Sequence, residues 1–233
     1  MNVNQEPIPA RSSVDEEGNA VQMFSAEHDI IRDYITAGAR NADQLPIEDL
    51  AAVADYLADA HRRRSNVYVF GNGACAALAS HMAADLGKAL VSERFPPSHP
   101  ISVSGQRLMI SALTDNASFM TAIGNDLHYE DVFLEQLRTL LRPDDVVIGL
   151  SASGTSPNVL RALEFARAAN ARTVCFTGQL VEEPAILELA DLSVVAPSSS
   201  IDTVEDLHVV FHHAVVRAYK FAISARKEEF VYA

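Results

Sequence analysis

The residues with the clearest chemical potential lie in the segment SASGTSPN at positions 151–158. Its hydroxyl side chains, which can donate hydrogen bonds to phosphate oxygens, surround a glycine that allows the backbone to approach an anion closely. The segment follows the apolar run DVVIGL and leads into a helical pattern that ends near Ala169. The start of such a helix offers unpaired N–H groups and a partial positive charge. These features together predict a phosphate-binding loop between a strand and a helix.

An ordinary capped turn is the competing interpretation of this segment. Ser156 suits the N-cap position and Pro157 the first helical position. A cap requires one serine, however, and the loop supplies four hydroxyl groups, which favours phosphate binding. The segment is neither a Walker loop nor a dinucleotide-binding fingerprint, because it lacks the lysine of the first and the glycine spacing of the second.

Histidines and carboxylates form a second chemical group on two predicted helices. His81 and Asp85 are four residues apart and therefore share one helical face. Near the C-terminus, three residues form one stripe and a fourth borders it: Glu205, His208 and His212, then His213. Two such His/carboxylate sets could bind zinc or a similar ion, or could transfer the protons that aldose–ketose isomerisation requires. The spacing is also compatible with ordinary surface or internally satisfied contacts.

Alternating apolar runs and helical patterns predict the framework that positions these groups. Buried strands separated by helices indicate a parallel sheet covered on both faces. The expected strands are 66–70, 100–103, 145–150, 172–176 and 191–195. The expected helices are 22–39, 46–64, 75–91, 131–141, 157–169, 182–189 and 204–226. We therefore expect an α/β three-layer sandwich with a central parallel sheet and additional N-terminal helices.

Composition narrows the range of partners and settings. The chain has 233 residues and a formal net charge of −13, which argues against general binding to nucleic acid. No apolar run approaches the roughly 20 residues of a membrane-spanning helix, and the N-terminal residues lack the apolar core of a signal peptide. Cys75 and Cys175 are too few for a disulfide framework, so a reducing cytoplasmic setting is expected.

Several short motifs, taken together, resemble the sugar isomerase (SIS) domain family and its phosphoheptose isomerase branch. The resemblance covers about residues 30–222. Its motifs are the serine loop at 151–156, FGNG at 70–73, LTDN at 113–116, AIGND at 122–126 and VEDLH at 204–208. It implies a flavodoxin-like fold, with residues 20–233 as one SIS domain that includes the helical pair 22–64. Residues 1–19 are polar, contain two prolines and show little periodicity, so we expect them to form a mobile arm.

The resemblance implies specific roles for residues of this chain. Phosphate would be held by Ser151, Ser153 and Ser156, and the sugar would contact Asn72 and Asp115. A turn residue at Asn72, and a turn former or N-cap at Asp115, remain the alternatives. A divalent metal, expected to be zinc, would be bound by His81, Asp85, Glu205 and His213. Asp85 and His213 would also act as base and acid.

Three positions depart from the pattern that the family usually shows. Asp85 replaces a glutamate and has a carboxylate one methylene shorter, while Glu205 replaces a glutamine. A base withdrawn by about 1 Å can cost on the order of 100-fold in rate. Cys75 lies in a turn that commonly reads Gly-Gly-Ser, and we interpret it as a packing residue. The choice between His212 and His213 stays open, because one helical position separates them.

The implied activity is conversion of sedoheptulose 7-phosphate to a heptose 7-phosphate through an enediol, in a homotetramer whose N-terminal helices pair between subunits. One alternative is a non-catalytic SIS protein that binds a sugar phosphate or a protein such as a replication initiator. Another is an isomerase with a different sugar phosphate as substrate. Tyr129 and His128 are treated as surface or packing residues.

Overall fold

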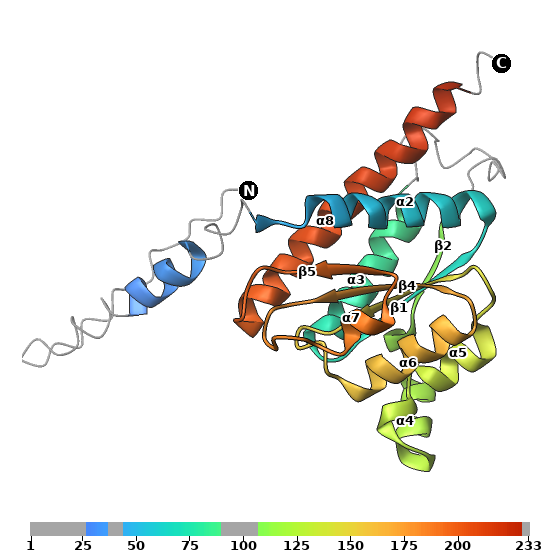
Figure 1. The fold of residues 1–233 in the computed structure, drawn as a ribbon, viewed down its shortest axis with the longest axis horizontal. Coiled ribbons are helices and arrows are strands. Elements are labelled where there is room, and N and C mark those ends of the chain that lie inside the picture. The colour runs from blue at the N-terminus through green and yellow to red at the C-terminus, as the bar shows by residue number, and fades with distance from the viewer. Residues whose placement is uncertain (1–26, 37–43, 90–106, 230–233) are drawn as a thin grey trace, which may run out of the picture. The chain divides into compact units, whose positions relative to one another are not determined.

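The computed structural model describes residues 27–36, 44–89 and 107–229, with side chains up to Ser224 (Figure 1). The chain divides into two units, residues 1–43 and residues 44–233, and each is described by itself. In the first unit a helix occupies residues 27–36, inside the helix predicted at 22–39. The rest of that prediction, the proposed arm at 1–19 and the strand predicted at 100–103 lie outside the described residues.

A five-stranded parallel sheet forms the centre of the second unit. Its strands are β1 (Asn66–Gly71), β2 (Met109–Ala112), β3 (Val146–Leu150), β4 (Arg172–Thr177) and β5 (Leu192–Val195). Their order across the sheet is β2-β1-β3-β4-β5, and every neighbouring pair is parallel. This is the flavodoxin-like order, in which ligands bind beyond the carboxyl ends of the strands where the order reverses. That reversal lies between β1 and β3.

Helices cover both faces of this sheet, so the predicted three-layer architecture is confirmed. The helices α2 (Ile47–Arg63), α3 (Ala74–Lys88) and α8 (Ile201–Glu229) pack on one face. The opposite face is covered by α5 (Leu134–Leu140), α6 (Pro157–Ala168) and α7 (Ile186–Leu189), and the short helix η3 (Tyr129–Asp131) packs against α6. Alternation along β1 serves both layers, because Val67 and Val69 join the first core while Tyr68 and Phe70 join the second.

Four parts of the second unit differ from the sequence prediction. The strand β2 and the helix α4 (Ala117–Asp126) were not predicted. The side-chain oxygen of Asn116 caps α4 by accepting the Phe119 N–H at 3.2 Å. The single helix predicted at 131–141 instead consists of η3 followed by α5. The helix predicted at 182–189 is shorter and occupies only α7, after Pro184.

The register of the sheet places two site-forming loops beside each other. Gly71 at the end of β1 is paired with Leu150 at the end of β3. The turn after β1 contains Asn72, and the loop after β3 begins at Ser151. Both loops therefore leave the sheet at the same edge, next to the first turns of α3 and α6. Among the described residues, none of the helices combines the length and apolarity that a membrane span requires.

Candidate functional site

The turn after β1 depends on close packing that only glycine permits. A Cβ atom on Gly71 would lie 2.6 Å from the Cβ atom of Cys75 and 2.7 Å from the carbonyl oxygen of Leu150. Glycine thus allows the end of β1 and the first turn of α3 to press against the end of β3. The thiol of Cys75 is buried, which raises its pKa, as expected for a packing residue rather than a reactive one.

The loop after β3 is organised by its own hydroxyl groups. The oxygen of Ser151 accepts the Gly154 N–H at 3.1 Å and lies 3.2 Å from the Ser156 hydroxyl oxygen. The hydroxyl oxygens of Ser153 and Thr155 are 3.0 Å apart. Gly154 has φ +67°, a left-handed conformation that favours glycine. The loop therefore holds a compact set of hydroxyl groups at the start of α6.

Ser156 takes the N-cap position of α6 and Pro157 opens the helix, as the sequence predicted. The Ser156 side chain makes no capping hydrogen bond, so the capping interpretation does not account for its hydroxyl group. A pocket of about 170 Å³ lies against this loop and includes four of the five expected substrate-binding residues. Its polar lining residues are Asn72, Ser151, Ser153, Ser156 and Glu205.

Asp115 is the expected substrate-binding residue that this pocket does not include. It lies in the 3-10 turn after β2 and accepts a hydrogen bond from the Ser80 hydroxyl group. It lines a different, more open hollow of about 470 Å³, together with Ala83 and Ile110. The structure thus places Asp115 beside α3, separate from the serine loop.

Asn72 belongs to a hydrogen-bonded side-chain network. Its Nδ2 donates to Asn158 Oδ1 at 2.9 Å, and Asn158 Nδ2 donates to Asn72 Oδ1 at 2.8 Å. The Tyr129 hydroxyl group also donates to Asn72 Oδ1, at 3.1 Å. Tyr129 therefore contacts the site, although the sequence offered only its proximity to a predicted turn. Asn158 was part of the predicted loop but had no predicted role.

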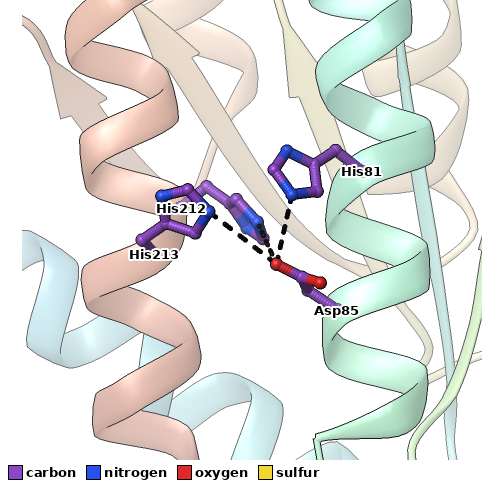
Figure 2. A group of neighbouring side chains, drawn as sticks. All are labelled: His81, Asp85, His212 and His213. Carbon is purple, nitrogen blue, oxygen red and sulfur yellow. Dashed lines mark hydrogen bonds and ion pairs between the residues drawn. The ribbon is translucent and has the colours of Figure 1, made fainter. Parts of the chain in front are cut away.

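A second group of side chains lies between α3 and α8 (Figure 2). The carboxylate oxygen Oδ2 of Asp85 is 3.2 Å from Nε2 of both His81 and His212. Nε2 of His213 is 3.8 Å from the same oxygen. The other oxygen, Oδ1, pairs with the Lys88 ammonium group at 2.8 Å. We call His81, Asp85, His212 and His213 the histidine cluster.

The electrostatics of the histidine cluster favour a charged carboxylate and a neutral buried imidazole. The Lys88 ammonium, followed by the His212 N–H, holds the pKa of Asp85 below its usual value. Burial lowers the pKa of His212 to about 4, since the hydrogen bond to Asp85 only partly offsets desolvation. His212 is fully buried, whereas the His213 side chain is about half exposed, at 51%.

Glu205 lies outside the histidine cluster. It lines the serine pocket and also an adjoining cavity of about 320 Å³, whose other walls include His81, Cys75 and His208. No hydrogen bond or ion pair joins its carboxylate to the described residues. His208 is buried in α8, and its Nε2–H donates to the carbonyl oxygen of Thr177 at 3.1 Å. Burial lowers the pKa of His208 to about 4.

The donor atoms of the histidine cluster are suited to a divalent transition metal. Three imidazole nitrogens and one carboxylate oxygen lie within 4.8 Å of one another. Zinc is commonly bound by His and carboxylate ligands in four-coordinate sites. The structure brings together three of the four expected ligands, His81, Asp85 and His213, and adds His212. Glu205, the fourth expected ligand, is not in this group.

Comparisons with known proteins relate this chain to a described family. The profile of the SIS domain family matches residues 32–178. A probable phosphoheptose isomerase of Thermoplasma acidophilum is 34% identical over 182 residues, which cover 78% of this chain and 93% of the relative. The phosphoheptose isomerase of Mycobacterium tuberculosis strain H37Ra is 34% identical over 186 residues, which cover 80% of this chain and 88% of that one.

Solved structures show the same relationship. The phosphoheptose isomerase GmhA from Neisseria gonorrhoeae matches with a TM-score of 0.70 and 26% identity, over 85% of this chain and 98% of that one. A phosphoheptose isomerase from Francisella tularensis, at 22% identity and a TM-score of 0.65, shares the fold. It covers 86% of this chain and 97% of that one.

Proposed function

We infer that this chain, which belongs to the SIS domain family and to its phosphoheptose isomerase branch, is a sugar-phosphate isomerase. We propose that it converts sedoheptulose 7-phosphate to a heptose 7-phosphate through an enediol. One observation carries this proposal: the serine pocket and the cavity beside His81 adjoin, with Cys75 and Glu205 lining both. A phosphorylated sugar bound in the first can extend into the second.

The serine loop is the proposed phosphate site. Ser151, Ser153 and Ser156 line the pocket and can donate hydroxyl hydrogen bonds, and the first N–H groups of α6 lie next to them. These local dipoles attract an anion even though the protein has a net charge of −13. Glu205 lies between this pocket and the histidines, where its carboxylate can accept hydrogen bonds from sugar hydroxyl groups. Asp115 remains a proposed sugar contact.

Asp85 and His213 are the proposed base and acid. Asp85 takes a proton from C1 of the ketose while His213 gives a proton to O2, and the C1–H electron pair becomes the C1–C2 double bond of the enediol. Asp85 then returns its proton to C2 as His213 removes the proton from O1, which leaves the aldehyde at C1. The low pKa of Asp85 keeps the carboxylate ionised, and the exposure of His213 allows proton exchange with solvent.

The histidine cluster is the proposed binding site of a zinc ion. His81, Asp85, His212 and His213 would hold it, and the sequence-based alternative replaces His212 with Glu205. A bound divalent cation would supply Lewis-acid polarisation of the sugar carbonyl and hydroxyl groups. His212 is the buried member of the cluster, which suits a role confined to holding the ion and orienting Asp85.

We further propose that the protein is a homotetramer. On α8, Val210 and Phe221 are large apolar side chains with exposed fractions of 56% and 73%. Apolar side chains of this size on a helix surface are suited to burial against a second copy of the chain. Light scattering combined with size-exclusion chromatography would measure the assembly, and a monomer at micromolar concentration would contradict the proposal.

An NMR time course with sedoheptulose 7-phosphate tests the proposed function. The purified protein should generate the signals of a heptose 7-phosphate, and added zinc should accelerate the conversion after treatment with a chelator. Binding of the sugar phosphate without conversion, with and without zinc, would contradict the isomerase proposal. That outcome would favour the non-catalytic alternative. Two features support that alternative: the carboxylate of Asp85 is one methylene shorter than the usual glutamate, and it forms an ion pair with Lys88.

A further inference from the structure

The amide network around Asn72 leaves an uneven set of hydrogen-bonding groups. The oxygen of an asparagine side chain has two acceptor positions, and its nitrogen has two N–H donors. Asn158 and Tyr129 occupy both acceptor positions of Asn72 Oδ1, at 2.8 and 3.1 Å. Asn158 Oδ1 takes one N–H of Asn72 at 2.9 Å. One N–H donor of Asn72 therefore remains unused within the described structure.

The remaining N–H donor of Asn72 belongs to a residue that lines a candidate ligand pocket. Asn72 lines the serine pocket together with Ser151, Ser153 and Ser156. An amide free to rotate by 180° could offer the pocket either an acceptor or a donor. The reciprocal pair with Asn158 opposes rotation of the Asn72 amide alone, because that rotation would set nitrogen against nitrogen and oxygen against oxygen. The Tyr129 hydroxyl group adds a second donor on the oxygen side.

We propose that Asn158 and Tyr129 are positioning residues that lock the Asn72 amide as a hydrogen-bond donor toward the phosphorylated substrate. The proposal rests on the proposed function for the identity of the ligand. A fixed N–H donor suits a phosphate or sugar oxygen that has no proton to give. Asn158 also ties the turn after β1 to the first turn of α6, and only 2% of its surface is exposed. The network thus joins the two loops that form the pocket.

A double-mutant cycle tests whether these residues act through Asn72. The measured quantity is the Kd for sedoheptulose 7-phosphate, by calorimetry, in wild-type protein and in the N72A background. In wild-type protein, N158A should raise Kd about tenfold and Y129F about threefold, the range expected for the loss of hydrogen bonds. In the N72A background, the same two changes should each alter Kd less than twofold.

Controls separate positioning from folding and from failure of the proposed function. Y129F changes a side chain that is 58% exposed, so it should leave the thermal midpoint unchanged even if N158A lowers it. The matched control N125A removes an exposed amide of α4 that donates to Asp126 Oδ1 at 2.8 Å, and it should not change Kd. The positioning proposal would be wrong if N158A and Y129F raised Kd as much in the N72A background as in wild-type protein. It would also be wrong if neither change altered Kd in wild-type protein. Both outcomes would leave the proposed function in place. Wild-type protein that binds no sugar phosphate would overturn both proposals.

Discussion

Acid should destabilise this fold through His208, and the size of the effect follows from its surroundings. The imidazole is fully buried and donates from Nε2 to the Thr177 carbonyl oxygen. Burial lowers its pKa to about 4 in the folded state, from 6.5 in the unfolded chain. The unfolded state therefore binds more protons between these two values, so stability falls as pH falls through this window.

The expected loss follows from the two pKa values. Between pH 7.5 and pH 5, His208 alone should reduce the free energy of unfolding by about 2 kcal/mol, and by pH 4 the loss should reach about 3 kcal/mol. The matched variant is H208Q, because a glutamine amide can still donate to the Thr177 carbonyl oxygen but does not titrate. His212, with a similarly lowered pKa, contributes to both proteins and cancels in the comparison.

Urea unfolding at several pH values measures this difference. Wild-type protein and H208Q should be compared at one protein concentration, since an oligomer's stability depends on concentration. The wild-type free energy of unfolding should fall more steeply below pH 6.5, and its loss between pH 7.5 and pH 5 should exceed that of H208Q by about 2 kcal/mol. Parallel curves from pH 7.5 to pH 4 would show that His208 is not held neutral by burial, and the reasoning would be wrong.

Three further predictions concern the site itself. Gly154→Ala should lower the free energy of unfolding by at least about 1 kcal/mol in urea titrations, because φ is +67° and the new Cβ would lie 2.5 Å from the Cβ atom of Pro184; unchanged stability would contradict the loop geometry. Asp85→Asn should reduce kcat at least about 100-fold in steady-state assays while changing the Kd for sugar phosphate less than twofold, and a kcat within threefold of wild type would exclude Asp85 as the base. Zinc titration after dialysis against a chelator should show one bound ion per wild-type chain. His212→Gln should bind zinc about tenfold or more weakly, whereas Glu205→Gln should leave zinc affinity unchanged; the reverse ranking would return Glu205 to the ligand set.

The main sheet and its helices could be predicted because a continuous apolar run indicates a buried strand and an apolar stripe indicates a packed helix. The strands β1, β3, β4 and β5 follow this rule. The edge strand β2 does not, since it has four residues and Met109 is 45% exposed. The helix α4 has no buried residue, so its sequence carries no core-facing stripe, and the cap at Asn116 marks its start instead.

The site could be predicted where its residues are contiguous and less well where they meet across the fold. The serine loop is one segment, so its composition was sufficient. The contact between Tyr129 and Asn72 joins residues 57 positions apart, and the periodicities of helices and strands do not predict contacts at that separation. Glu205 shares a stripe with His212, but seven residues at 1.5 Å rise separate them by about 10 Å along α8. They therefore face different partners, and only the packing of α3 against α8 shows that His212 and His213 both approach Asp85.

Deuterium incorporation in D₂O tests the central claim, proton transfer between C1 and C2 of a ketose phosphate, most directly. Sedoheptulose 7-phosphate incubated with the protein should lose the signal of one of its two C1 protons in the NMR spectrum, because the proton held by Asp85 exchanges with D₂O between the two transfers, and the Asp85→Asn variant should be at least about 100-fold slower. Retention of every C1 proton during long incubation, with no heptose 7-phosphate formed and with binding demonstrated in the same sample, would contradict the account.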